Sequence, residues 1–442
     1  MSVDAVRDAA VDVLLRVFER NEYLDVALDR KIRRTSLSER GRRFLAQLVY
    51  GTVRHKLLCD YVLTGVLDQP VEQLPPPIHA ILRMGAFQAL FCTQVTFPAM
   101  VHTSVDLAKA RGHAGTAKLV NAVLRRIPQR IEEVRLPPKD KSHSRHLSVR
   151  YSLPVWLIEQ WIQQFGQDTA AELAVISAEP APLVLRVSLN RTTVDELARR
   201  LARAGCQVEK RTRVPEELTV LEGNPLRSKL FDHGLFLAQD PASMLAAHLL
   251  EPKPGERVLD LCAAPGGKST HLAQLSEGRA FVVASDNQPR RLAQVADNVR
   301  RLETESVSVV AADGQAPPFA CFFDAILVDA PCTGFGTLRR HPDLKWRTEP
   351  DDALRLARLQ QALLRSAFTL CENKGRIVYS VCTTTPEETD GIREFAGSLG
   401  AIEWEDGPEW LNHWKIAPGT YRTLPLDGSM DAFYLMRLRK RS

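Results

Sequence analysis

The chain has 442 residues, 45% of them hydrophobic, and a formal net charge of +5 at pH 7. This length is enough for two to four domains with buried cores. No apolar run is long enough to cross a bilayer and no charged leader precedes a cleavage site, so we expect a cytoplasmic protein with no membrane partner. The eight cysteines form no CxxC pair and no Cys/His metal spacing, which indicates reduced thiols, no disulfide framework and no metal site.

Residues 1–136 are predicted to form an all-helical domain. Apolar residues recur at helical spacing from Ala5 to Arg20, and a capping box at 36–39 opens the next expected helix. Further amphipathic helices are expected at 78–91 and 101–126. The polar, basic segment 137–150 begins with two prolines and is predicted to be a linker.

Two further domains are expected after the linker. Residues 151–250 alternate helical patterns at 155–165 and 194–204 with strand-like runs at 183–189 and 218–221, which indicates a small α+β domain. In residues 251–442, apolar strands are predicted at 257–261, 280–285, 307–311, 325–329 and 375–380, with helices between several of them. This alternation predicts a Rossmann-like α/β domain with a doubly wound parallel sheet.

Basic residues gather in two places. The stretch 124–150 holds eight Lys or Arg residues against three acids, and Arg339, Arg340, Lys345 and Arg347 follow Cys332 closely. One such patch alone is usually a solvated surface, but two of them favour a polyanionic substrate. We expect the 339–341 segment to bind phosphates and Trp346 to stack on a base; a place for Trp346 in the core is equally simple.

Two cysteines lie where strands run into polar loops. Cys332 follows the strand in FDAILVDAPCTG, and Cys382 ends the strand in GRIVYSVCT. A parallel α/β sheet binds its ligands outside the carboxyl ends of its strands, so both sulfurs are expected to face the same ligand. A pair of thiols in that position suggests covalent chemistry.

A nucleotide-like ligand is indicated by the first strand of the last domain. It ends in DLCAAPGGKS, where Gly266 and Gly267 allow close backbone approach at a helix N-terminus, although the pattern is not a P-loop. Asp286 ends the next strand, where a carboxylate can accept both hydroxyls of a ribose. Asp313 ends the third, where it can meet the exocyclic amine of an adenine. Together these residues outline an adenosine-shaped site.

These runs carry a family resemblance. DLCAAPGGKSTHL, DAPCTGFGTLRRHPDLKW and YSVCTTTPEE resemble the motifs of RNA cytosine-5 methyltransferases, which use S-adenosylmethionine. LVYGTVRHKLLCDYVL and AVLRRI, near the N-terminus, resemble the RNA-binding fold of the NusB antitermination factor. That fusion is found in the bacterial Sun (Fmu, RsmB) subgroup, which methylates small-subunit ribosomal RNA.

The resemblance implies roles for individual residues. Cys382 matches the nucleophile that adds to carbon 6 of cytosine, Cys332 matches the cysteine that helps to release the RNA, and Asp329 matches a group that hydrogen-bonds the N3 and N4 edge. The residues expected around the cofactor, with Asp286 on the ribose and Asp313 near the adenine, are Cys262, Ala263, Ala264, Pro265, Gly266, Gly267, Lys268, Asp286, Asp313 and Asp329. Val381, Thr389 and Ala432 depart from the usual family residues without removing a reacting group.

The expected function is therefore methylation of carbon 5 of one cytosine in 16S ribosomal RNA, unassembled or partly assembled, by a monomer that needs no metal. Transfer RNA stays open as the substrate. A DNA cytosine-5 methyltransferase would use the Pro-Cys loop cysteine as its nucleophile, and Cys382 and the helical domain argue against it. A non-enzymatic RNA-binding or antitermination-like factor is the remaining alternative, and the intact cysteines and acids argue against that.

Overall fold

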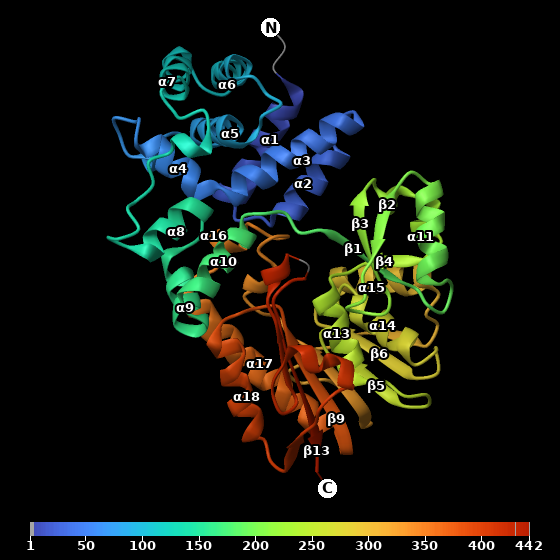
Figure 1. Cartoon of the computed structure of the whole chain (residues 1–442). Coiled ribbons are helices and arrows are strands. Elements are labelled where there is room, and N and C mark those ends of the chain that lie inside the picture. The colour runs from blue at the N-terminus through green and yellow to red at the C-terminus, as the bar shows by residue number, and fades with distance from the viewer. Residues whose placement is uncertain (1–3, 429, 442) are drawn as a thin grey trace. The chain divides into compact units, whose positions relative to one another are not determined.

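The computed structural model describes residues 4–428 and 430–441, which form two compact units. Unit 1 takes in the chain up to Pro180 together with Leu338–Thr348, and unit 2 takes in Ala181–Thr337 and the chain from Glu349 onward. The expected fold class is confirmed: an all-helical part, a small α+β part and a Rossmann-like α/β part are all present (Figure 1). None of the described helices is long and apolar enough to span a membrane.

Unit 1 is helical, and a large apolar core is formed by residues between Ala9 and Val149. Its first helix begins where the Asp4 carboxylate accepts hydrogen bonds from the amides of Val6 and Arg7. Residues 101–126, expected as one helix, form two, because His113 and Thr116 make a capping box that starts a new helix. The helices are α1 (Ala5–Glu19), α2 (Leu24–Arg33), α3 (Glu39–Arg54), α4 (Lys56–Thr64), α5 (Pro76–Phe91), α6 (Phe97–Arg111), α7 (Ala114–Leu124), α8 (His143–Tyr151), α9 (Val155–Phe165), α10 (Gln167–Ser177) and α16 (Leu344–Arg347).

The segment expected as a linker is partly helical. Ser142 caps α8, and Leu147 and Val149 on this helix are buried. Helices α9 and α10, which we expected to belong to the small α+β domain, lie in unit 1 with α8. The division at 1–136, 137–150, 151–250 and 251–442 remains a prediction, and the two spatial units follow different bounds.

The basic segment 338–348 belongs to unit 1, although the chain on either side of it belongs to unit 2. The Lys345 ammonium is buried and donates hydrogen bonds to the carbonyls of Arg54 and Ser152, each at 3.1 Å. Trp346 packs against the helical core and its indole N–H donates to the carbonyl of Val53 at 2.8 Å. Arg339 is also buried, and donates to the carbonyl of Pro180. The prediction that the 339–341 segment binds phosphates is therefore wrong for Arg339, and the core position of Trp346 is the correct alternative.

Unit 2 is built on a large mixed sheet. Its strand order is β11-β12-β13-β9-β8-β5-β6-β7, and β10 also pairs with β13. The five strands β5 to β9 are joined by parallel pairs, and β10 to β13 join the sheet by antiparallel pairs. The antiparallel strands were not among those predicted. The strands are β5 (Arg257–Asp260), β6 (Phe281–Asp286), β7 (Val307–Ala311), β8 (Phe323–Asp329), β9 (Cys371–Val381), β10 (Ile402–Trp404), β11 (Lys415–Ala417), β12 (Thr420–Thr423) and β13 (Phe433–Lys440).

Helices cover both faces of this sheet, and alternate residues along each strand point into the two apolar cores on opposite faces. Val258 and Val378 pack in one core with helices α13 (Pro241–Leu250), α14 (Gly267–Leu275) and α15 (Pro289–Leu302). Leu259 and Ile377 pack in the other with α17 (Pro350–Leu370) and α18 (Asp390–Gly397). Figure 1 shows these two helical layers in yellow-green and orange. The parallel strands therefore have only their ends free for a ligand.

A smaller antiparallel sheet precedes the large one in the chain. It has the order β2-β3-β1-β4 and forms a separate apolar core with the buried leucines of α11. Its elements are β1 (Leu183–Val187), α11 (Val194–Arg203), β2 (Gln207–Lys210), β3 (Glu217–Glu222), α12 (Lys229–Asp232) and β4 (Phe236–Ala238).

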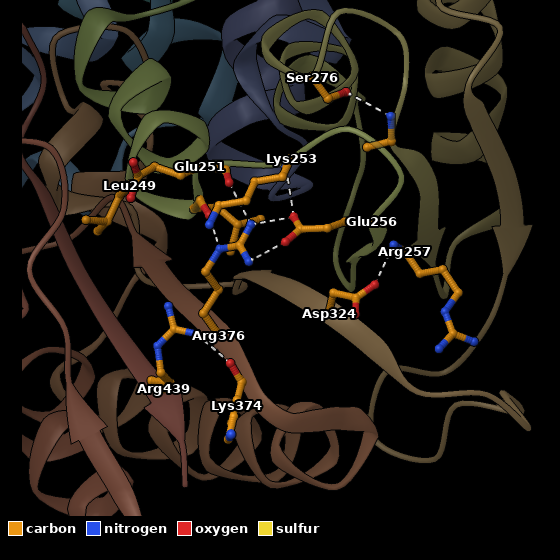
Figure 2. Close-up of polar contacts among 12 residues, drawn as sticks. Leu249, Glu251, Lys253, Glu256, Arg257, Ser276, Asp324, Lys374, Arg376 and Arg439 are labelled. Carbon is orange, nitrogen blue, oxygen red and sulfur yellow. Dashed lines mark hydrogen bonds and ion pairs between the residues drawn. The ribbon is translucent and has the colours of Figure 1, made fainter.

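At the end of the large sheet opposite the predicted site, a buried arginine makes hydrogen bonds to several segments (Figure 2). Arg376 of β9 makes a bidentate ion pair with Glu256, at 2.8 and 2.6 Å, just before β5. It also donates to the carbonyls of Leu250 and Glu251, where α13 ends. One side chain therefore links β9 to α13 and to the loop that leads into β5.

Candidate active site

Cys332 and Cys382 meet at the carboxyl ends of two adjacent parallel strands. Asp329, the last residue of β8, is in register with Ser380 near the end of β9. The two sulfurs lie 3.3 Å apart, within hydrogen-bond distance for thiols. The close approach to Cys382 and burial both raise the pKa of Cys332, so Cys332 stays a protonated thiol. The predicted pair of thiols therefore forms one cluster.

The backbone around Cys382 is held by a glycine. The carbonyl of Cys382 accepts a hydrogen bond from the amide of Gly336 at 2.9 Å, and the Gly336 carbonyl accepts one from the amide of Ala432 at 3.1 Å. A Cβ added at Gly336 would lie 1.9 Å from the Ala432 carbonyl oxygen, so only glycine fits here. The loop after Cys332 is thus joined to both the Cys382 loop and the C-terminal β-strands.

A buried carboxylate joins the two cysteine loops. Glu388 accepts hydrogen bonds from the amide and the hydroxyl of Thr333, from the Thr385 hydroxyl at 2.5 Å, and from the Gln360 amide at 2.9 Å. Gln360 also donates to the carbonyl of Pro331, next to Cys332. Burial raises the pKa of Glu388, against the lowering effect of these hydrogen bonds. This network fixes the loop that follows each cysteine.

Lys268 lies beside the cysteines and pairs with Asp329. Its ammonium is 2.7 Å from the Asp329 carboxylate and lies over the ring of Phe433. Burial works against the charge, but Asp329 first and Cys382 next raise the pKa of Lys268, which keeps it protonated. Lys268, which was expected only as part of the cofactor loop, is therefore the cation of this cluster.

Three carboxyl groups gather at the ends of β5, β6 and β8. Asp260 is completely buried; its pKa is raised to about 7, mainly by burial and further by the charges of Asp329 and Asp286. One Asp260 oxygen accepts from the Ser269 hydroxyl at 2.6 Å, and the other has no hydrogen-bond partner among the described residues. Burial and these same three carboxyls raise the pKa of Cys262. The local charge therefore favours a cationic ligand.

The predicted glycine loop runs between β5 and α14. Gly266 has φ of +96° and precedes the first residue of the helix, Gly267. The amide of Ala263 donates to the Ser285 carbonyl, and the carbonyls of Ala264 and Pro265 accept from Arg291 and Asn298. The loop is thus fixed against β6 and α15.

The two predicted adenosine-binding acids differ in their surroundings. Asp286 is buried and accepts from the amides of Ala264 at 3.3 Å and Gln288 at 2.9 Å, which ties it to the glycine loop. Asp313 is exposed, two residues beyond β7, and accepts from the amide of Gln315 in its own turn. The structure brings Asp286 next to the predicted cofactor loop, whereas Asp313 lies on the next strand end.

Sequence reasoning missed three residues of this cluster: Asp260, Gln360 and Glu388. Asp260 begins the quoted glycine-loop motif and Glu388 ends the quoted cysteine motif, so their places in those motifs were the available signals. Gln360 has no such signal, because it lies within the long amphipathic helix α17. The departures from the family pattern are all buried, and Thr389 donates to the carbonyl of Thr385 at 2.7 Å.

The chain matches three protein families along its length. These are the NusB family over residues 4–129, a ferredoxin-like domain of RsmF/B-like methyltransferases over 153–227, and 16S rRNA methyltransferase RsmB/F over 247–439. The catalytic match thus covers the cysteines, the glycine loop and the antiparallel strands that follow.

Curated relatives match the whole chain. Ribosomal RNA small subunit methyltransferase B of Thermus thermophilus is 36% identical, with 100% of this chain and 99% of the relative covered. The protein of the same name from Pseudomonas putida is 32% identical over 98% of both chains. Among solved structures, one titled "Crystal Structure of PH0851" has a TM-score of 0.83 at 28% identity and covers 100% of both chains. The chain is a methyltransferase and belongs to the ribosomal RNA small subunit methyltransferase B family.

Proposed function

We propose that this enzyme methylates carbon 5 of a cytosine in 16S ribosomal RNA with S-adenosylmethionine, through a covalent bond between Cys382 and carbon 6. The observation that carries the proposal is the 3.3 Å approach of the Cys332 and Cys382 sulfurs beside the Lys268–Asp329 pair. Carbon 5 of cytosine is a poor nucleophile, and addition of a thiolate to carbon 6 makes it an enamine carbon that can attack an electrophilic methyl group.

Cys382 provides the thiolate in this scheme. The Lys268 ammonium interacts electrostatically with Cys382, so a positive charge lies beside the sulfur that attacks the base. The Asp329 carboxylate holds Lys268 at 2.7 Å. Asp329 retains exposed surface, with 28% of its side chain accessible, from which it can accept the N4–H of the base.

Cys332 acts after the methyl group is in place. The proton on carbon 5 must leave, and the Cys382–carbon 6 bond must then break with its electron pair returning to Cys382. Cys332 stays protonated until this stage because burial and Cys382 raise its pKa. When Cys382 becomes a neutral thioether, that negative neighbour is gone, and the Cys332 thiol can lose its proton to solvent. The resulting thiolate takes the proton from carbon 5, and the electron pair of that C–H bond forms the carbon 5–carbon 6 double bond as the Cys382–carbon 6 bond breaks.

The residues present fit S-adenosylmethionine. The cofactor carries a sulfonium and an amino group, and the Asp260, Asp286 and Asp329 carboxyls gather around the loop that would hold it. Asp260 also has an unpartnered buried oxygen there. When bound, S-adenosylmethionine supplies the methyl group. We assign its contacts to the 262–268 loop and Asp286, and the adenine end to the neighbourhood of Asp313.

RNA binding is proposed for the basic stretch 124–150. In contrast to the buried Arg339 and Lys345, seven of its eight Lys and Arg side chains are exposed: Arg125, Arg126, Arg130, Arg135, Lys139, Lys141 and Arg145. Exposed lysine and arginine side chains at this density bind RNA phosphates, a contact that does not depend on the base sequence. The NusB family match over residues 4–129 and the relatives named for small-subunit ribosomal RNA support 16S RNA over transfer RNA. The cytoplasmic location and the monomeric state stay predictions.

The test is methylation of defined RNAs. The purified full-length chain is incubated with S-adenosylmethionine and either an unmodified 16S transcript or a pool of unmodified transfer RNA transcripts, and bisulfite sequencing then locates 5-methylcytosine. We expect one modified cytosine in 16S RNA. Modification of transfer RNA alone would replace the substrate, and methyl transfer to an atom other than carbon 5 would overturn the chemistry.

A further inference from the structure

Three metal-ligating side chains from different elements converge in unit 2, and the reaction proposed above uses none of them. Glu216 directly precedes β3, His248 lies on α13 and His271 lies on α14. Nε2 of His271 is 2.6 Å from Oε1 of Glu216, and Nε2 of His248 is 2.9 Å from the same oxygen. One ligand atom from each residue lies within 4.8 Å of the other two.

The cluster is closed off from solvent on most sides. The Glu216 and His271 side chains have no exposed surface, and 12% of His248 is exposed. Nε2 of His271 approaches Glu216 outside regular hydrogen-bond geometry, and Nδ1 of His271 is buried with no partner among the described residues. Nε2 of His248 lies within hydrogen-bond distance of both Glu216 oxygens, at 2.9 and 3.2 Å. Two imidazole nitrogens thus converge on one buried carboxylate, which is a set of donors that can bind a cation.

We propose that Glu216, His248 and His271 bind a divalent transition-metal ion of the zinc class. Two imidazoles and one carboxylate are a known zinc donor set, which leaves a fourth tetrahedral position for water. Metal–ligand bonds of about 2.0–2.2 Å place neighbouring ligand atoms about 3.3 Å apart. The observed 2.6 and 2.9 Å separations must therefore open by several tenths of an ångström, which side-chain torsions can supply.

The positive charge of Arg186 lies near Glu216 and works against binding of a metal cation there. It is buried, and its interaction with Glu216 is electrostatic. Its guanidinium donates elsewhere, to Gln239 Oε1 at 2.6 Å, to the carbonyl of Gly267 and to the Thr270 hydroxyl at 2.9 Å. The Glu216 oxygens therefore receive no hydrogen bond from this arginine and stay available to a metal ion.

The proposed metal would hold three elements of unit 2 together. It would join the start of β3 and helix α13 to α14, whose first turn carries Lys268. The Trp410 and His248 rings pack in a T-shaped arrangement, with ring centroids 5.0 Å apart. The ligands lie 32 and 23 positions apart in the chain, so local spacing in the sequence does not reveal them.

Cobalt titration tests the proposal. Untagged full-length protein is purified with a chelator, exchanged into chelator-free buffer and titrated with Co²⁺ and then with Zn²⁺. We expect one Co²⁺ per chain with the strong visible bands of a four-coordinate ion, their loss when Zn²⁺ displaces it, and a higher thermal midpoint with either metal. Absence of a stoichiometric Co²⁺ site in the wild-type protein would overturn the proposal.

Variants identify the ligands. His248→Asn, at the partly exposed position, is expected to abolish the cobalt bands while circular dichroism stays unchanged. His233→Asn changes an exposed histidine of the same unit and is expected to bind Co²⁺ like the wild type. Wild-type binding by His248→Asn would contradict the assignment. X-ray absorption of the wild-type cobalt protein gives the same answer without a variant, because it must show two imidazole ligands.

Discussion

Glu388 accepts two hydrogen bonds from Thr333, one from its amide at 2.9 Å and one from its hydroxyl at 2.5 Å. Thr333 follows Cys332 directly, and Glu388 lies on the loop after Cys382. The pair therefore sets the relative position of the two cysteine loops, through a carboxylate that is fully buried. A buried carboxylate with this many donors is rigid, because each donor would lose its partner if the carboxylate moved.

Replacing Glu388 by Ala should lower the free energy of unfolding by about 3 kcal/mol, since it leaves several buried donors unpaired. Methyl transfer should fall at least tenfold through kcat, with little change in KM for RNA. Glu388→Gln keeps part of the network and should restore much of the activity. Glu387→Gln, one residue earlier, is the matched control and should behave as wild type. A stable Glu388→Ala enzyme with normal kcat would contradict this role.

Lys268→Met should slow alkylation of Cys382 by iodoacetamide at neutral pH. Loss of a neighbouring positive charge worth about 1.4 kcal/mol corresponds to about a tenfold lower rate. Lys268→Arg keeps the charge and should react nearly as fast as wild type. Peptide mass spectrometry separates Cys382 from the exposed Cys321. An unchanged rate in Lys268→Met would show that another group favours the thiolate.

Asp260 should make the folded chain less stable as the pH rises from about 4 to about 7. Its pKa in the folded state is raised to about 7, so the native state holds a proton that the unfolded chain releases near pH 4. Stability is therefore fully present below the unfolded pKa and is lost as the pH passes the folded pKa, by at most about 4 kcal/mol. In denaturant unfolding across this range, the free energy of unfolding of Asp260→Asn should fall less steeply with pH than that of the wild type. Part of the pH dependence that remains in this variant would come from Glu388, whose pKa is also raised.

Arg376→Ala should destabilise unit 2 by about 3 kcal/mol, because it leaves the Glu256 carboxylate and two carbonyls without their buried donor (Figure 2). Arg257→Ala provides the control. Its ion pair with Glu372 is 3.3 Å long and nearly half exposed, and its loss should change the free energy of unfolding by less than about 0.5 kcal/mol. Equal effects of the two substitutions, measured by denaturant unfolding, would contradict this account.

The strands that carry the candidate site could be predicted from the sequence. The run 307–311 matches β7 at both ends, and the strands ending near Asp286 and Asp329 differ from prediction by a residue or two. These strands are buried on both faces and therefore read as continuous apolar runs. The antiparallel strands β10 to β13 are short or carry alternating charges, as in Phe433–Lys440, and were not predicted.

Charge patterns were a poor guide to burial. Lys345 and Arg339 belong to a basic cluster that indicated a polyanionic substrate, yet both are buried and donate hydrogen bonds to carbonyls of residues 54, 152 and 180, far away in the chain. The Glu388 network has the same character: Thr333, Gln360 and Glu388 come together only when β8, α17 and β9 pack. Pairings that depend on tertiary packing leave no local periodicity to read.

The most direct test of the two-cysteine mechanism is a denaturing-gel adduct assay with 16S RNA, radiolabelled S-adenosylmethionine and three proteins: wild type, Cys332→Ala and Cys382→Ala. Cys332→Ala should carry covalently bound RNA, because the Cys382–carbon 6 bond forms but is not resolved. Cys382→Ala should give neither adduct nor methylated RNA. An adduct on Cys382→Ala, or methylation by it, would contradict the assignment of Cys382 as the nucleophile.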